Sequence, residues 1–258
     1  MPVALITGAA RGIGAAAAGA LAAQGWDLVL TDICGDDPAV GYPLAGTGDL
    51  TATAERCGGE ALVGDVRSAA DLQRAVEVAM ERFGRLDAAV AVAGVLVPAP
   101  HAWEMPEDRW HAQLDTNLTG VFNLARAAVP ALLAAPQPRS GRFVAVSSAA
   151  ALKATPRLAA YSASKAGVIG LVRGLAADLA GTGITANTVL PGSTDTTVLD
   201  YSAEVYGLND PDRFADHHVD RRIVDPGEVA AVVAWLCSPA SSALTGAVVP
   251  ADAGMTAR

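Results

Sequence analysis

The sequence predicts a doubly wound α/β domain, in which helices cover both faces of one parallel sheet. Short apolar segments alternate with helical patterns along the whole chain, and these segments are apolar on both faces, as in strands buried within a parallel sheet. A glycine-rich turn joins the first strand to the first helix. The expected strands are VALIT (3–7), DLVLTD (27–32), EALVGD (60–65), LDAAVAVAG (86–94), GRFVAVSS (141–148), ITANTVL (184–190) and GAVVPAD (246–252). The expected helices are 13–24, 68–82, 106–134, 159–180 and 226–237.

We expect a single domain over residues 1–258, because no linker or internal repeat interrupts this alternation. Hydrophobic residues make up 52% of the chain, which is enough for a large core. Two regions do not follow the strand–helix pattern. Residues about 33–50 are rich in Gly and Pro and leave directly from the second strand, whereas residues about 193–223 are mixed and polar.

Charge and cysteine content exclude several classes of protein. Lys and Arg number 18 against 27 Asp and Glu, and the formal net charge of -9 opposes binding to nucleic-acid phosphates. The three cysteines are scattered and odd in number, which suits a reducing cytoplasm rather than a disulfide framework. We read no signal peptide or membrane span, so a cytoplasmic protein is expected. The four histidines show no ligand spacing, and no metal is expected.

The glycine-rich turn TGAARGIG predicts a dinucleotide site. Gly8, Gly12 and Gly14 are spaced G-x3-G-x-G and open the first expected helix. Glycines allow a tight turn and close approach to a pyrophosphate, which binds at a helix N-terminus. A glycine-rich turn without a ligand is the alternative, but the order of strand, turn and helix favours a Rossmann-type site. Arg11 and Ile13 belong to the same turn and are expected to contact the dinucleotide.

The ends of the next two strands predict which dinucleotide binds. Asp32 ends the second strand, where a carboxylate accepts hydrogen bonds from the adenosine ribose and repels a 2′-phosphate. NAD is therefore expected rather than NADP, although Arg11 could favour the 2′-phosphate and a strand-end Asp could cap a turn. Ile33 is expected in the same site. Asp65 could contact the adenine amino group, with Val66 on the ring; a turn Asp is the alternative.

Three polar residues predict an acid–base centre. Tyr161 and Lys165 are four residues apart in YSASK and therefore lie on one face of a helix. A nearby ammonium stabilises phenolate and so lowers the pKa of a phenol, which makes Tyr161 the predicted general base. Ser148 ends the strand FVAVSS, where its hydroxyl could bond a substrate oxygen. Tyr-x3-Lys alone occurs in many helices, but its combination with the glycine turn and the strand-end serine favours catalysis.

These motifs together resemble the short-chain dehydrogenase/reductase family over essentially the whole chain. The resemblance implies that Tyr161 transfers the alcohol proton, that Lys165 binds the nicotinamide ribose, and that Ser148 orients the carbonyl. It also implies that Asn117, in DTNLTG, completes a proton relay through water; a polar residue that disrupts a helix is the alternative. In PGSTDT, the resemblance assigns cofactor contacts to Pro191, Gly192, Thr194 and Thr196.

Two motifs depart from this family. AVAG stands where NNAG is usual, with Ala91 and Val92 in the positions of the two asparagines. Ala93 and Gly94 remain, so close approach to the cofactor is preserved while a side-chain brace is lost. DAG replaces DGG near the C-terminus, and neither change touches the proton chemistry.

The Gly/Pro-rich region narrows the resemblance further. DICGDDPAVGYPLAGTGDL, together with WLCSPASSALTG, resembles the subgroup associated with the redox peptide cofactor mycofactocin, which includes carveol dehydrogenase-like enzymes. That subgroup implies NAD that does not exchange freely and is reoxidised through mycofactocin. We expect residues about 33–50 to cover the adenosine half of NAD, with a tolerated surface insertion as the alternative.

The expected activity is hydride transfer between NAD and a small, largely apolar secondary alcohol or ketone. Residues about 193–223 would form the substrate loop, and Asp200, Tyr201, Tyr206 and Phe214 could line a pocket or pack a helix. Family resemblance alone implies a homotetramer. Two alternatives remain: a reductase of the same family that exchanges NAD(P), and a non-catalytic protein that senses a dinucleotide.

Overall fold

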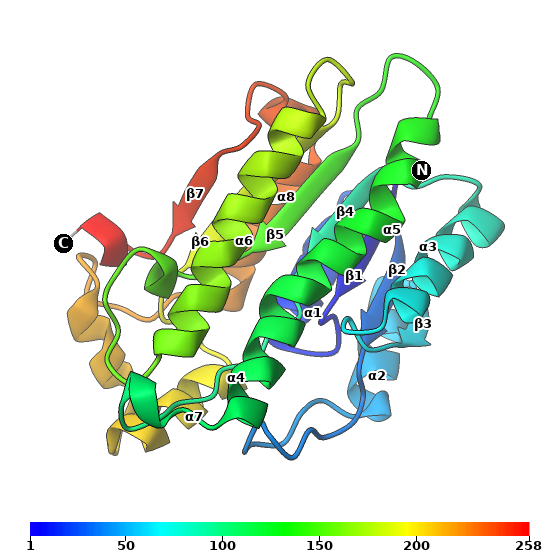
Figure 1. Ribbon diagram of the computed structural model, residues 1–258. Helices are drawn as coiled ribbons and strands as arrows, with labels where there is room; N and C mark the ends of the chain where they lie inside the picture. Colours follow the sequence, from blue (N-terminus) through cyan, green and yellow to red (C-terminus); the bar gives the residue numbers. More distant parts are fainter. Residues whose placement is uncertain (258) are drawn as a thin grey trace.

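A parallel sheet organises the structure, a computed structural model that describes residues 1–257 (Figure 1). Seven strands lie in the order β3-β2-β1-β4-β5-β6-β7, and all neighbours are parallel. They are β1 (Val3–Thr7), β2 (Asp27–Asp32), β3 (Glu60–Val63), β4 (Ala88–Ala91), β5 (Arg142–Val146), β6 (Thr185–Pro191) and β7 (Val248–Ala251). The strand order reverses between β1 and β4, where sheets of this kind bind ligands outside the carboxyl ends of the strands. The predicted doubly wound fold is confirmed.

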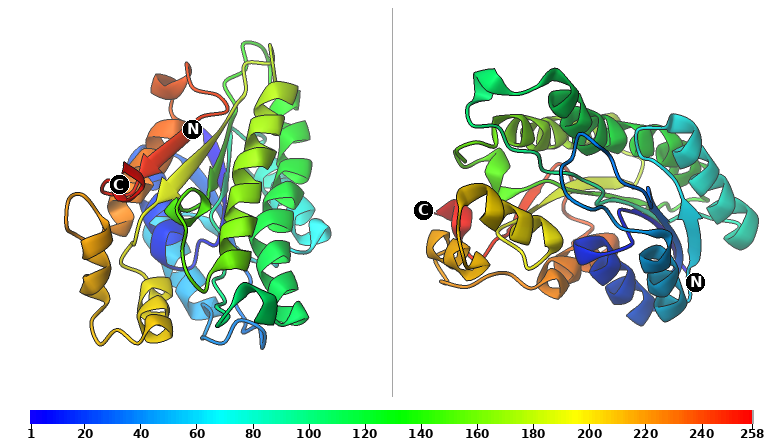
Figure 2. Two further views of the ribbon diagram at one scale, coloured as in Figure 1. Left: turned by 60° about the vertical axis from the view of Figure 1, so that its left-hand side comes forward. Right: turned by 90° about the horizontal axis from the view of Figure 1, so that it is seen from below.

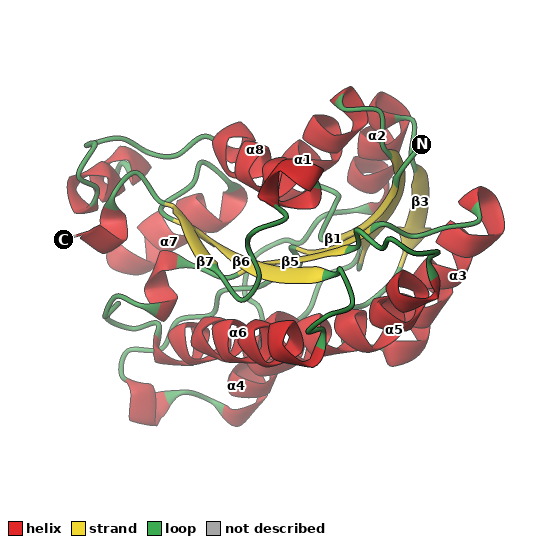
Figure 3. Ribbon diagram, turned by 90° about the horizontal axis from the view of Figure 1, so that it is seen from above, coloured by secondary structure: helices red, strands yellow, loops and turns green. Residues whose placement is uncertain are grey.

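Helices cover both faces of the sheet (Figure 3). α1, α2 and α8 lie against one face, and α3, α5 and α6 lie against the other. The helices are α1 (Gly12–Ala23), α2 (Thr47–Cys57), α3 (Ala69–Phe83), α4 (Glu107–Leu114), α5 (Gly120–Ala134), α6 (Ala159–Asp178), α7 (Thr197–Tyr206) and α8 (Pro226–Cys237). In Figure 1, α7 lies beyond the carboxyl ends of the strands, so it is placed to wall a site at that end.

The central strands are buried because both of their faces carry helices. All residues of β1 and β5 are buried, and Phe143 of β5 is among the largest fully buried side chains. One apolar cluster fills the space on each side of the sheet. The edge strand β3 is only partly buried. The close-packed centre therefore gives a rigid floor to the groups at the carboxyl ends of β1, β4 and β5.

The helix expected over residues 106–134 is continuous from Glu107 to Ala134, but a π-helical turn that the sequence did not predict divides it. α4 ends at Leu114, a π-helical segment spans Asp115–Thr119, and α5 begins at Gly120. Asn117 is fully buried within the π-helical segment, and its side chain bonds the backbone of Val95 beyond β4. A π-helical turn accommodates one more residue than an α-helical turn, and such turns often occur at functional sites.

The two irregular regions contain helices that the sequence patterns did not predict. α2 begins at Thr47, so the irregular segment after Asp32 ends at Gly46 rather than near residue 50; we call it the 33–46 loop. Asp49 accepts a hydrogen bond from the backbone N–H of Gly46 (2.8 Å) and so caps this helix. The region 193–223 contains α7 and a 3-10 segment over Pro211–His217. In Figure 2 the 33–46 loop passes close to α7 although the two are far apart in sequence.

Within the described residues, no helix is long and apolar enough to cross a membrane.

Candidate active site

The glycine turn after β1 allows two backbone segments to touch. A Cβ atom on Gly8, whose φ is +66°, would lie 2.6 Å from the backbone of Ala93 after β4. A Cβ atom on Gly14 would lie 1.9 Å from the carbonyl oxygen of Gly8. Both positions therefore require glycine. Arg11 precedes α1 but its side chain caps no backbone N–H, and the first turn carries no acidic residue. The N-terminal amides of α1 can therefore bind an anionic group.

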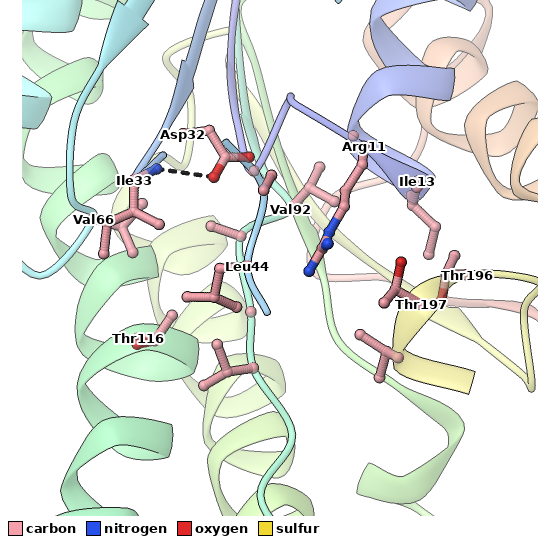
Figure 4. A pocket seen from close by; sticks show the side chains of 18 of the residues that line it. Arg11, Ile13, Asp32, Ile33, Leu44, Val66, Val92, Thr116, Thr196 and Thr197 are labelled. Atoms are coloured by element: carbon pink, nitrogen blue, oxygen red, sulfur yellow. Dashed lines mark hydrogen bonds between the residues drawn. The ribbon is translucent and has the colours of Figure 1, made fainter. Parts of the chain in front are cut away.

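A cavity of about 450 Å³ lies in front of this turn at the point where the strand order reverses (Figure 4). Of the predicted cofactor contacts, its lining includes Gly8, Arg11, Gly12, Ile13, Gly14, Asp32, Ile33, Asp65, Val66, Ala93, Gly94 and Thr196. It also includes residues that sequence reasoning missed, among them Tyr42, Leu44, Arg67, Thr116 and Thr197. A glycine cradle, a helix N-terminus and a strand-end carboxylate in one elongated cavity fit a dinucleotide.

Asp32 supports the glycine turn from the end of β2. Its carboxylate accepts hydrogen bonds from the backbone N–H of Ala10 (3.0 Å) and Ile33 (2.9 Å). Burial raises the pKa of Asp32, while these N–H groups and the Arg11 guanidinium oppose that rise. Figure 4 shows Asp32 and Arg11 on opposite sides of the cavity. The carboxylate remains at the cavity wall, where the ribose contact is predicted.

Arg11 points to the 33–46 loop. One of its guanidinium nitrogens donates a hydrogen bond to the carbonyl oxygen of Pro43 (2.8 Å). The guanidinium that we considered a possible partner of a 2′-phosphate is thus bound to the protein's own loop. This arrangement favours Asp32 as the residue that discriminates between the two dinucleotides.

Asp65 stabilises the turn after β3, which was the alternative interpretation of this residue. It accepts hydrogen bonds from the backbone N–H of Arg67 (2.9 Å) and from the Arg67 guanidinium. Arg67 also forms an ion pair with Asp37 of the 33–46 loop (2.6 Å). Asp65 lines the cavity, so a contact with adenine stays a prediction. Arg67 was missed because its partner Asp37 lies 30 residues away along the chain.

Tyr42 attaches the 33–46 loop to the far side of the cavity. Its hydroxyl accepts a hydrogen bond from the backbone N–H of Leu96 (3.2 Å), and its ring centroid lies 4.5 Å from that of Tyr201 in α7. Tyr42 and Val40 are buried with Val95 in a small apolar cluster. The loop therefore contacts the glycine turn, the segment after β4, the turn after β3, and α7.

The turn after β4, where the asparagine pair is missing, is held by Thr7 of β1. The hydroxyl of buried Thr7, at the end of β1, accepts hydrogen bonds from the backbone N–H of Val92 (3.2 Å) and Ala93 (3.4 Å). A Cβ atom on Gly94 would lie 3.1 Å from both Asn117 Oδ1 and Lys165 Nζ. The AVAG turn thus stays close to the catalytic helix, braced from β1.

Ser148, Tyr161 and Lys165 come together as predicted, although one electrostatic expectation was wrong. Lys165 Nζ donates a hydrogen bond to the carbonyl oxygen of Val146 (3.0 Å) and lies 5.8 Å from the Tyr161 ring centroid. Burial raises the pKa of Tyr161 despite a hydrogen bond with Ser148 that opposes the rise. We had expected Lys165 to lower it. Burial also lowers the pKa of Lys165 to about 8, which weakens its charge as a stabiliser of phenolate.

Asn117 uses its side chain to hold the backbone. Its Oδ1 accepts from the N–H of Val95 (2.8 Å), and its Nδ2 donates to the carbonyl of Val95 (2.8 Å) and to Ser164 Oγ (3.0 Å). These bonds join the segment after β4 to α6. Asn117 lines neither cavity, so a proton relay through it stays a prediction.

The segment after β6 lies beside the acid–base centre. Pro191, Gly192, Thr194 and Thr196 all line a second cavity, and Thr194 donates to the carbonyl oxygen of Gly192 (3.0 Å). Buried His218, one of the four histidines without ligand spacing, supports this segment. Its Nε2 accepts from the N–H of Ser193 (3.2 Å), and its Nδ1 donates to the carbonyl of Arg222 (2.5 Å).

The second cavity measures about 520 Å³ and contains Ser148, Tyr161 and Lys165 in its lining. Most of its other lining side chains are apolar, among them Leu96, Ala149, Ala150, Leu158, Leu199, Leu208 and Met255. Of the four residues that could line a pocket or pack a helix, Tyr206 and Phe214 line this cavity, whereas Tyr201 lines neither cavity. Asp200 is exposed and lines neither cavity. Gly94, Val95, Thr196 and Val198 line both cavities, so the two spaces adjoin at the acid–base centre.

The depressed pKa of Lys165 predicts a pH-dependent stability. Between pH about 8 and 10.5 the unfolded chain binds a proton that the folded protein has released, so the free energy of unfolding rises with pH. Below pH 8 Lys165 is protonated in both states, so the full free-energy cost of burying its charge opposes folding there. We expect the free energy of unfolding of the parent, relative to Lys165→Met, to rise by a few kcal/mol across this window, at ~1.4 kcal/mol per pKa unit. Denaturant titrations at several pH values measure it, and a flat difference would contradict it.

Comparison with known proteins agrees with this geometry. Residues 8–256 match the family model described as enoyl-(acyl carrier protein) reductase, a model of short-chain dehydrogenases. The (-)-trans-carveol dehydrogenase of Rhodococcus erythropolis is 36% identical over 271 residues, covering 98% of this chain and 97% of that protein. An uncharacterized NAD-dependent oxidoreductase of Mycobacterium tuberculosis is 37% identical, covering 98% of this chain and 94% of that protein.

Solved structures show the same fold. Carveol dehydrogenase from Mycobacterium avium in complex with NAD matches with a TM-score of 0.92 and 34% identity, covering 100% of this chain and 98% of that chain. A short chain dehydrogenase from Mycobacterium paratuberculosis bound to NAD matches with a TM-score of 0.85 and 33% identity, with the same coverage. The family model matches nearly the whole chain, the relatives cover it almost fully, and Ser148, Tyr161 and Lys165 lie in one site near the glycine turn. The chain therefore belongs to the short-chain dehydrogenase/reductase family.

Proposed function

We propose that the protein is an NAD-dependent alcohol dehydrogenase/ketone reductase that acts on a small, largely apolar secondary alcohol or its ketone. One observation carries this proposal: Ser148, Tyr161 and Lys165 line a mostly apolar cavity that adjoins the dinucleotide-shaped cleft. The relatives named as carveol dehydrogenases and as NAD complexes support it.

The side chains divide the proton chemistry between them. The glycine turn and Lys165 would hold NAD, which would supply the hydride chemistry: NAD⁺ as acceptor from the carbinol carbon in oxidation, NADH as donor in reduction. Tyr161 takes the hydroxyl proton in oxidation and donates it to the carbonyl oxygen in reduction. Ser148, which hydrogen-bonds Tyr161, orients the substrate oxygen. Lys165, anchored to Val146, holds the nicotinamide ribose and places a cation near Tyr161.

The raised pKa of Tyr161 favours the neutral phenol, which is the form that donates a proton in reduction. Oxidation requires the phenolate, so it should accelerate as the pH rises. The apolar wall opposite this centre excludes water and favours a substrate with an apolar body.

Removing the hydroxyl of Tyr161 should abolish most of the turnover. We expect Tyr161→Phe to retain cofactor binding and to lower the single-turnover rate by at least ~10²-fold, because only the proton-transferring group is lost. Tyr206→Phe removes a hydroxyl from the same cavity, where it bonds the Pro156 carbonyl (2.5 Å), and should lower the rate far less. A Tyr161→Phe rate within tenfold of the parent would show that another group moves the proton.

NAD preference should depend on Asp32. The Asp32→Asn variant keeps an oxygen that can accept a backbone N–H and removes the charge that repels a 2′-phosphate. We expect NADP affinity relative to NAD to rise by about tenfold or more. Asp27→Asn makes the same charge change at the other end of β2 and should leave the ratio unchanged. Titration of cofactor-free protein with both nucleotides measures it; equal affinities in the parent would mean that Asp32 does not select NAD.

We further propose that the 33–46 loop retains NAD between turnovers, so that an external carrier such as mycofactocin reoxidises it in place. Four contacts support this role: Arg11 with Pro43, Asp37 with Arg67, Tyr42 with Leu96, and Tyr42 with Tyr201. Tyr42, Leu44 and Ala45 also line the cofactor cleft. A loop attached on several sides must release several contacts before a ligand beneath it leaves.

Shortening the loop should release the cofactor. Replacement of residues 34–45 by a short Gly-containing turn should speed exchange of labelled NAD by about 10²–10⁴-fold. This range assumes ~1.5–3 kcal/mol for each of two buried side chains, Val40 and Tyr42, and 1.4 kcal/mol per decade. A mass spectrum of the denatured parent should show co-purified NAD.

A point variant tests the same proposal without shortening the chain. Arg67→Met breaks the ion pair with Asp37 and should speed exchange several-fold. Arg74→Met breaks exposed ion pairs on α3 with Glu77 and Glu81 and should not change exchange. If the shortened protein folds and exchanges NAD no faster than the parent, the loop does not retain the cofactor.

A further inference from the structure

The substrate cavity carries basic side chains at the end formed by the C-terminal turn. Lys153 and His217 line the cavity, as does Met255. The Lys153 ammonium donates a hydrogen bond to the carbonyl oxygen of Met255 (3.2 Å), which leaves two of its donors free. Lys153 is half-buried, and it forms no ion pair with any residue that the structure describes.

The segments that carry Lys153 and His217 both contact the C-terminal turn beside the cavity. Lys153 belongs to the segment that joins β5 to α6, between Ser148 and Tyr161. His217 ends the 3-10 segment after α7, and its ring lies 6.4 Å from that of Phe214, another lining residue. Asp220, just beyond His217, donates its backbone N–H to the carbonyl of Ala253 (3.1 Å). The turn over residues 253–255 therefore touches both segments.

The charge of this cavity is opposite to that of the protein. The chain has a formal charge of -9, with 27 acidic against 18 basic residues. Yet none of the described residues that line the cavity is Asp or Glu, whereas two are lysines and one is His. Lys165 serves the acid–base centre, but Lys153 has no such role. A backbone carbonyl does not neutralise an ammonium, so Lys153 adds a positive potential to an otherwise apolar cavity.

We propose that the substrate carries a carboxylate at the end remote from the reacting carbon, and that Lys153 selects it. The inference rests on the proposed function and refines its substrate class to hydroxy acids and oxo acids with an apolar chain. The carbinol or carbonyl carbon lies at Ser148 and Tyr161, and the chain packs along the apolar wall. The carboxylate pairs with Lys153 and accepts a hydrogen bond from His217.

The test compares methyl-ketone carboxylic acids of increasing chain length with their methyl esters. Protein loaded with NADH is mixed with each ketone, and the loss of reduced nicotinamide is followed in a single turnover. The hydride goes to the carbonyl carbon and the proton from Tyr161 to its oxygen. At the best chain length, we expect the acid to react with at least about tenfold higher efficiency at low concentration than its ester. The preference should shrink at high salt.

Three variants assign the preference to Lys153. Lys153→Met should bring the acid-to-ester ratio to about one, through loss of the reaction with the acid. Lys153→Arg keeps a cation and should keep most of the preference. Arg173→Met removes a positive charge from an exposed position on α6 and should leave the ratio at the parent value.

The outcomes separate this inference from the proposed function. If the parent reduces the esters as well as the acids at every chain length, or if Lys153→Met keeps the preference, the carboxylate site is refuted while the dehydrogenase activity stands. If neither series reacts, calorimetry of simple alkanoates binding to the NADH-loaded parent and to Lys153→Met decides separately. Alkanoate binding that does not depend on Lys153 would refute the site.

Discussion

The site depends on how closely the backbone after β1 approaches the backbone after β4. Gly8 lies so near Ala93 that no side chain fits between them, and a Cβ atom on Gly94 would press more mildly on the side-chain ends of Lys165 and Asn117. Thr7 bonds the second turn from the first strand, and Asn117 bonds it from the π-helical segment. A larger residue at this contact would move the cofactor cleft and the catalytic lysine together, because one stretch of backbone forms a wall of both.

Burial acts on the two central ionisable groups in the same direction, toward their neutral forms. It raises the pKa of Tyr161 and lowers that of Lys165. The apolar wall that suits a substrate body is thus the same feature that disfavours a separated phenolate and ammonium. A charged ligand in the adjoining cleft changes this balance, so the acid–base properties of the centre belong to the assembled complex rather than to these side chains alone.

Much of the fold and the centre of the site were predictable because their signals are local. Buried strands are apolar on both faces, and the glycine turn, Ser148, Tyr161 and Lys165 belong to short motifs next to those strands. Features set by contacts between distant segments were not predictable. The π-helical segment depends on the bond from Asn117 to Val95, and His218 acts through backbone groups of two other segments.

Other misses came from local signals that were ambiguous or absent. The start of α2 was hidden by glycines at 46 and 48, although Leu50, Thr53 and Ala54 form its buried face. The rise in the pKa of Tyr161 comes from tertiary burial, which the spacing of Tyr161 and Lys165 does not reveal. Arg67 bridges Asp37 and Asp65 from a position with no motif of its own.

The contact between Tyr42 and Tyr201 connects a wall of the cofactor cleft to a helix that lines the substrate cavity. Tyr42 belongs to the wall of the cofactor cleft, while Tyr201 belongs to α7, whose Val198, Leu199 and Ser202 face the substrate cavity. A ligand that holds α7 in place also holds the partner of Tyr42. By thermodynamic reciprocity, any effect of one occupant on the affinity of the other is returned by the same factor. The loop is also attached to Arg11 and Arg67, so departure of the organic product would leave these contacts around the nucleotide in place.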